Sequence, residues 1–131
     1  MGILSILGLL TLCCPALCVY NEVRIHNEED FTNFVNDVNS GSTKSDYVGT
    51  TVFLENNLDF TDYGREFNPI GFNSPTPFSG TFDGQGFGID GIRLNVTDGY
   101  AGLFGYARGA TVKNIVFSIK TSASVCIHHI R

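Results

Sequence analysis

The segment from residue 78 to residue 117 most constrains the fold, because it repeats itself. The pentapeptide Gly80-Thr81-Phe82-Asp83-Gly84 recurs as Gly102-Leu103-Phe104-Gly105-Tyr106. An apolar triplet recurs with nearly the same offset. Self-similarity with a period of roughly 20–50 residues is typical of stacked coils. The first triplet is Ile89, Ile92 and Leu94, and the second is Val112, Ile115 and Phe117.

Short strands separated by glycine-containing turns extend this pattern over residues 50–119. Asp-Gly and similar pairs stand between the apolar segments, where a turn needs a positive φ. No stretch between them is long enough for a crossover helix. The sequence therefore predicts an all-β fold, a short parallel β-helix of about three coils. The strand candidates are residues 80–82, 89–95, 101–106 and 112–119.

Residues 19–49 form a predicted N-terminal cap with a strand, a helix and a loop. Asn27 is the expected helix N-cap, three acidic residues fill the first turn, and Gly41 ends the helix. Its apolar residues recur at helical spacing and form one stripe. We expect this amphipathic helix to cover the open end of the first coil. The stripe consists of Phe31, Phe34, Val35 and Val38.

Residues 1–18 resemble a signal peptide. They carry no charged side chain, their apolar run at residues 3–12 is too short to span a bilayer, and small residues at 16 and 18 favour cleavage before Val19. An uncleaved anchor is the alternative. We expect a secreted or cell-surface protein, in which Cys126 would be the only mature cysteine. The formal net charge of −5 argues against a nucleic-acid partner.

Four segments together resemble the GLUG-motif repeat of secreted and surface proteins, across residues 50–119. They are Pro69-Ile70-Gly71, residues 78–86, Gly102-Leu103-Phe104-Gly105-Tyr106 and residues 110–115. The resemblance implies a right-handed parallel β-helix of the pectin-lyase-like kind. Proteins of this type are adhesin-like surface proteins, or carry the repeat as an accessory domain beside a peptidase. The resemblance therefore implies adhesion or structural display, with a protein or a glycan as partner.

Carboxylates are the only candidates for catalysis. Glycoside hydrolysis needs two carboxyl groups at a set separation, and Asp83 and Asp90 are the nearest candidates, with Asp59 and Asp62 as another close pair. Each of the first two precedes a glycine, which favours a structural role in a turn. We therefore predict no enzyme activity and keep a polysaccharide-active enzyme of the same fold as the alternative. Residues 85–93 nearly match a calcium-binding nonapeptide, but a single copy favours a glycine-rich corner, and we predict no metal and no cofactor.

Surface positions follow from the same pattern. Asn95 begins an Asn-Val-Thr glycosylation sequon. Residues 120–131 show no regular pattern, so we expect an irregular, uncapped end that either self-associates or indicates an incomplete fragment of a longer repeat protein. Four aromatic residues could form a binding surface, with packing inside the protein as the alternative role. They are Tyr63, Phe67, Phe72 and Tyr100.

Overall fold

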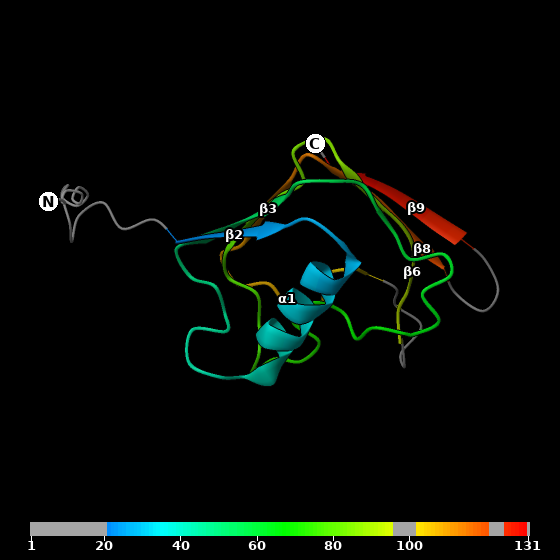
Figure 1. Ribbon diagram of the computed structural model, residues 1–131. Helices are drawn as coiled ribbons and strands as arrows, with labels where there is room; N and C mark the ends of the chain where they lie inside the picture. Colours follow the sequence, from blue (N-terminus) through cyan, green and yellow to red (C-terminus); the bar gives the residue numbers. More distant parts are fainter. Residues whose placement is uncertain (1–20, 96–101, 121–124, 131) are drawn as a thin grey trace, which may run out of the picture.

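The computed structural model describes residues 21–95, 102–120 and 125–130, which form two four-stranded sheets and one helix (Figure 1). Neighbouring strands are parallel in both sheets, except for the last pair of the second sheet. The first sheet has the order β2 (Asn21–Ile25), β3 (Thr50–Leu54), β5 (Thr81–Asp83), β7 (Thr111–Lys113). The second sheet has the order β4 (Leu58–Asp59), β6 (Gly88–Arg93), β8 (Ile115–Lys120), β9 (Val125–Ile130).

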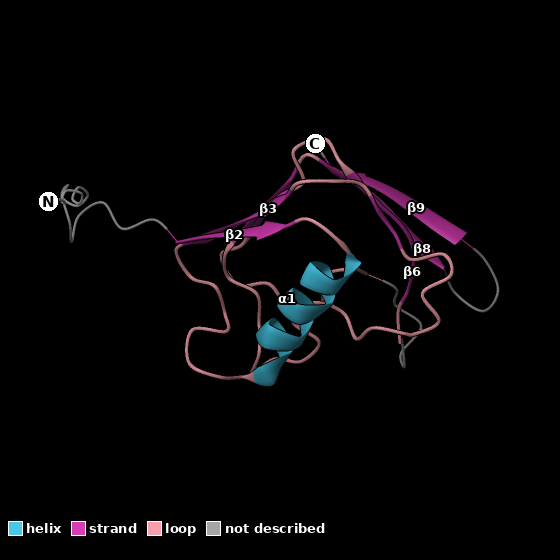
Figure 2. Cartoon of the chain, viewed as in Figure 1, coloured by secondary structure: helices cyan, strands magenta, loops and turns pink. Residues whose placement is uncertain are grey.

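The chain alternates between the two sheets. β3 leads into β4, β5 into β6 and β7 into β8, with a short corner at each passage. Figure 2 shows the two sheets meeting at an angle above the helix. Parallel pairing therefore places each pass of the chain beside the previous one, which confirms an all-β fold with one helix and parallel sheets.

The strand register corrects the expected repeat. Val52 pairs with Phe82 and Phe82 with Val112, so one pass of the chain is longer than the spacing between the two pentapeptides. Ile89 pairs with Phe117 and not with Val112. The repeated pentapeptides are not equivalent, because residues 81–83 form β5 whereas residues 102–106 lie in a connection between strands.

Those connections close a third side of the interior. Residues 60–80 run beside the described parts of residues 94–110, and three isolated parallel bridges join them. Ile70 donates its N–H to the carbonyl of Leu103 at 2.8 Å, and Gly105 donates its N–H to the carbonyl of Ile70 at 2.9 Å. The bridges are Phe67 to Leu94, Ile70 to Phe104 and Phe78 to Ala107.

The helix α1 (Glu28–Ser40) begins and ends as the sequence predicts. The side chain of Asn27 accepts a hydrogen bond from the N–H of Asp30 at 2.8 Å, and Gly41 adopts φ +72° beyond the last turn. The carboxylate of Glu28 accepts the N–H of Asp59 at 2.9 Å. The helix thus lies across the end of the sheets at which β2 and β4 are outermost (Figure 1).

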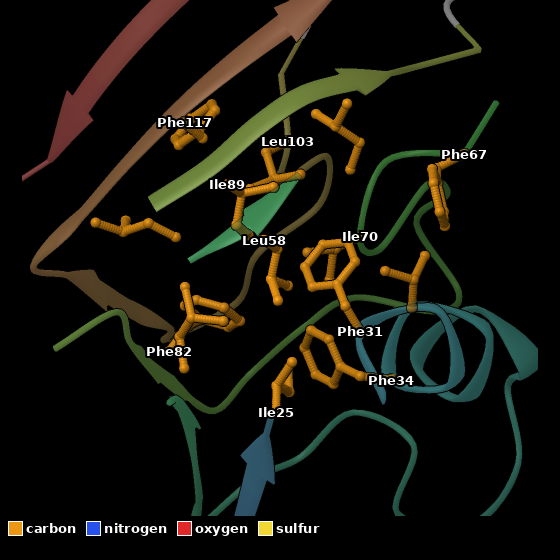
Figure 3. Packing of buried hydrophobic residues seen from close by; sticks show 14 of the residues in the cluster. Ile25, Phe31, Phe34, Leu58, Phe67, Ile70, Phe82, Ile89, Leu103 and Phe117 are labelled. Atoms are coloured by element: carbon orange, nitrogen blue, oxygen red, sulfur yellow. The ribbon is translucent and has the colours of Figure 1, made fainter. Parts of the chain in front are cut away.

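Aromatic rings fill the space between the helix and the sheets (Figure 3). Phe31 lies 5.4 Å from Phe60, and Phe34 lies 5.8 Å from both Phe78 and Phe82, measured between ring centroids. Tilted and edge-to-face pairs of this kind add attraction beyond their burial. The predicted apolar stripe of the helix is therefore part of the core, since all four of its residues are buried.

The C-terminal region differs from its prediction. Residues 125–130 form β9, which pairs antiparallel with β8, so the expected irregular structure of residues 120–131 is wrong for this strand. The sequence Val-Cys-Ile-His-His-Ile is rich in residues that favour strands. Without β9, β8 would be the unpaired edge of the second sheet. The predicted signal at residues 1–18 lies outside the described residues. Within the described ranges, no helix is long and apolar enough to cross a membrane.

Replacing Gly71 by alanine should destabilise the fold more than replacing Gly64. Both glycines have positive φ, +71° and +76°, so both variants bear a left-handed penalty of roughly 1–2 kcal/mol. A Cβ on Gly71 would also lie 2.4 Å from the carbonyl oxygen of Tyr106, whereas Gly64 faces open space. Urea unfolding should therefore give a cost for Gly71→Ala at least about 1 kcal/mol above that of Gly64→Ala. Equal costs would contradict the close packing of these connections.

Candidate functional site

A groove runs between α1 and the connection that follows β4. Its cavity of about 360 Å³ has helix residues on one wall and residues 65–72 on the other. We call it the α1 groove. It is lined by Thr32, Val35, Asn36, Asn39, Arg65, Glu66, Phe67, Asn68 and Phe72.

Asn39 fixes the two walls of the α1 groove against each other. Its side-chain oxygen accepts the N–H groups of Gly71 at 2.9 Å and Phe72 at 3.2 Å. Its side-chain nitrogen donates to the carbonyl of Pro69 at 3.1 Å. One side chain therefore satisfies three backbone groups of a segment that has no strand of its own.

The predicted aromatic residues separate into core and surface. Phe67 is only 5% exposed, and the ring of Tyr63 lies 4.9 Å from Phe60 while its hydroxyl lies 3.1 Å from that of Thr32. Phe72 is 43% exposed at the mouth of the groove. Tyr100 lies outside the described residues. The structure thus brings Phe67 and Phe72 to one groove, with Phe67 in its floor and Phe72 at its rim.

Charged side chains extend the α1 groove along the connection. An adjoining hollow of about 310 Å³ shares Arg65 and Glu66 with it and adds Asp62 and Arg93. Over the ranges that the structure describes, none of these four side chains forms an ion pair. The guanidinium of Arg65 lies 5.9 Å from the centroid of the Tyr63 ring. Both signs of charge are therefore available to a ligand.

The sequence did not predict the polar residues of the groove as site residues. Thr32, Asn36 and Asn39 recur at helical spacing along the border of the apolar stripe, a signal that could have indicated a second functional face of α1. Arg65 and Glu66 carried no local signal, because only the folded connection brings them beside the helix.

The groove is suited to a ligand with many hydroxyl groups. Guanidinium and amide groups offer paired donors, carboxylate and amide oxygens accept, and these match the donor and acceptor capacity of hydroxyls. The exposed ring of Phe72 offers an apolar face beside them. The α1 groove therefore combines hydrogen-bonding side chains with one exposed aromatic ring.

The carboxylate of Asp83 is used within a turn. It accepts the N–H of Gln85 at 2.9 Å and the side-chain amide of Asn114 at 3.1 Å. Gln85 also donates its side-chain N–H to the carbonyl of Leu54 at 3.0 Å. Gln85 and Asn114 both have positive φ, so these bonds hold two adjacent corners in a conformation that non-glycine residues rarely adopt.

A different pair of carboxylates meets on the second sheet. Asp59 of β4 and Asp90 of β6 are in-register partners, and both are exposed. Asp90 accepts the hydroxyl of Ser118, which itself accepts the N–H of Gly91 at 2.7 Å. Hydrogen bonds from Thr61 hold the pKa of Asp59 below its ordinary value. A general acid needs a raised pKa, so the state of Asp59 is opposite to that role.

The motif at residues 102–105 packs within the fold. Leu103 is buried, and the ring of Phe104 lies 5.5 Å from that of Phe78. A Cβ on Gly105 would lie 2.6 Å from the carbonyl oxygen of Gly71, and Gly102 is partly buried. These four residues therefore hold the third side of the interior closed and do not line the α1 groove.

Asn95 is exposed, as a glycosylation site requires. Its side-chain nitrogen lies 3.4 Å from the side-chain oxygen of Asn68, at the edge of the α1 groove. The other two residues of the sequon lie outside the described residues, so occupancy stays a prediction.

Among the residues that the structure describes, no group of three or more histidine, cysteine or acidic side chains could hold a metal ion. Comparisons with protein-family models, with curated proteins and with solved structures find no match for this chain. The resemblance to the GLUG repeat therefore stays a prediction from the residues that carry it.

Replacing Asn39 by alanine should destabilise the fold by about 2–3 kcal/mol, because two N–H groups and one carbonyl would lose their partner. Asn36→Ala is the matched control, since this exposed asparagine lies on the same helix and lines the same groove. Thermal unfolding of both variants measures the difference. Equal melting temperatures would contradict the anchoring role of Asn39.

The lowered pKa of Asp59 should make the stability of the fold depend on pH in the acid range. Because its folded pKa is lowered, the stabilisation is present above the unfolded value of about 3.9 and is lost as pH falls through the folded pKa. Asp59→Asn should therefore reduce the loss of stability below about pH 4. An NMR titration of the carboxyl carbon measures the pKa directly. A value above about 4 would contradict this assignment and would fit a general acid.

Proposed function

We propose that the chain is a short right-handed parallel β-helix closed at one end by α1. Three observations support this proposal: the chain alternates between two parallel sheets, Val52, Phe82 and Val112 are partners on successive strands, and bridges join the connections on a third side. The handedness rests on the resemblance to the GLUG repeat alone.

We infer that this module has no catalytic activity and acts in adhesion or structural display, secreted or at a cell surface. Two sequence features support a location outside the cell. They are the predicted signal peptide at residues 1–18 and the glycosylation sequon that begins at Asn95. The binding role rests on the α1 groove. The exposed Phe72 lines this groove together with Arg65 and Glu66. Neither of these two charged side chains has an ion-pair partner among the described residues.

A glycan is the ligand that the groove favours. Cations and carboxylates are balanced over the groove and the adjoining hollow, since Arg65 and Arg93 accompany Asp62 and Glu66. The two together therefore attract neither sign of charge strongly. Balanced charge and many hydrogen-bonding groups favour an uncharged, hydroxyl-rich partner. A protein partner would be expected to cover a larger and more apolar area than this cavity offers.

A polysaccharide-active enzyme is the second candidate, and one observation favours it. Asp59 and Asp90 are in-register partners on neighbouring parallel strands, so their side chains leave the same face of the second sheet. Glycoside hydrolysis uses two neighbouring carboxyl groups. Two observations count against it. Hydrogen bonds from Thr61 lower the pKa of Asp59, which disfavours a general acid, and the carboxylate of Asp90 already accepts the hydroxyl of Ser118.

Binding of the purified chain to an array of neutral and acidic oligosaccharides tests the adhesion role. We expect neutral glycans to bind, and Phe72→Ala and Glu66→Gln each to weaken that binding about tenfold. Tyr106→Ala is the matched control, because this exposed aromatic residue does not line the groove. Absence of any glycan binding, or equal losses in Phe72→Ala and Tyr106→Ala, would contradict the proposal.

A further inference from the structure

A second cavity lies beyond the C-terminal end of α1. It has a volume of about 590 Å³ and three walls, formed by residues 41–48, residues 75–79 and residues 108–109. We call it the loop cavity. It shares no lining residue with the α1 groove. The polar side chains that matter here are Lys44, Ser45, Asp46, Thr76, Ser79 and Arg108.

The walls of the loop cavity are held in place by bonds to the core. Ser79 donates its N–H to the carbonyl of Asp46 at 2.6 Å, which joins the first two walls. The backbone N–H of Arg108 donates to the backbone carbonyl of Phe78 at 3.0 Å, and this bond joins the third wall to the second. Tyr47 packs its ring 5.2 Å from Phe34. The cavity is therefore formed before any ligand binds.

The backbone of the first wall is constrained in an unusual way. Lys44 and Tyr47 have φ values of +69° and +63°, although neither is glycine. Such a conformation costs roughly 1–2 kcal/mol per residue. The hydroxyl of Tyr47 donates to Asp37 at 2.8 Å, which anchors the loop on α1. Outliers of this kind cluster where a loop must present side chains to a ligand.

Ser45 is the buried polar residue of the loop cavity. It is only 5% exposed, and it lines the cavity. A serine hydroxyl can donate one hydrogen bond. The Ser45 hydroxyl is therefore available as a donor to a group bound in the cavity.

The charge of the loop cavity differs from that of the whole chain, which is −5. Lys44 and Arg108 are exposed cations without an ion pair in the described ranges. The one lining carboxylate is that of Asp46, and it accepts the N–H of Val48 at 3.3 Å. The last carbonyls of α1 oppose an anion here. Both cations are therefore needed to make the cavity favourable for negative charge.

We propose that the loop cavity binds a compact oxyanion, a carboxylate, sulfate or phosphate group. Arg108 pairs with two of its oxygens, because a guanidinium presents parallel donors. Lys44 contributes a second positive charge, and Ser45 donates its buried hydroxyl. The group can be a free ion or one carried on an acidic sugar, and the chemistry of recognition is the same for both.

An NMR titration of the full chain with sodium sulfate, sodium phosphate and glucuronate, at constant ionic strength, tests the proposal. We expect saturable shifts of the backbone amides at residues 44–46 and 108–109. Lys44→Gln and Arg108→Gln should each weaken binding at least about tenfold, and Ser45→Ala should weaken it about threefold. Lys113→Gln is the control, because this exposed cation lies on β7 away from the cavity.

Each outcome of this titration decides the matter. Saturation by glucuronate alone would support a carboxylate carried on a sugar, and saturation by all three would support any small oxyanion. Absence of saturable shifts, or equal weakening by Lys113→Gln, would overturn the proposal. Spectra of each variant without ligand show whether the rest of the fold is unchanged, and a conservative Lys44→Arg variant should keep binding even where Lys44→Gln loses it.

Discussion

The aromatic stripe of α1 is the interaction on which the rest of the structure depends. The two sheets meet at an angle (Figure 2), and α1 lies across the end at which β2 and β4 are outermost. Phe31 and Phe34 project from α1 and contact rings from strands and connections alike. Removal of a buried phenylalanine costs about 3–5 kcal/mol, so the helix is part of the core and not an attachment to it.

Both proposed sites depend on the placement of this helix. The α1 groove uses its polar border, and the loop cavity lies where the chain leaves its C-terminal end. Asn39 fixes the connection that carries Phe72, and Asp37 accepts the hydroxyl of Tyr47 from the loop that carries Lys44. A ligand at either site would therefore stabilise the end of the fold as well as bind to it.

The sequence predicted the features that are set by neighbours in the chain. Asn27, Gly41 and the apolar stripe specify α1 because caps and helical spacing act within a few residues. Register between parallel strands joins residues that are distant in the chain, so the local similarity of two pentapeptides was misleading, and the meeting of Asp59 with Asp90 was missed. β9 escaped prediction because its strand needs the edge of β8. The polar lining of both sites is assembled from separate segments for the same reason.

The measurement that tests this account most directly is a set of backbone nuclear Overhauser effects between strands of the first sheet, in the purified chain. We predict contacts between the backbone protons of Val52 and Phe82 and between those of Phe82 and Val112, as parallel neighbours about 4.8 Å apart require. Such contacts would establish the stacked passes that position α1, its groove and the loop cavity. Backbone contacts of Phe82 with Phe104 in place of Val112 would contradict the account.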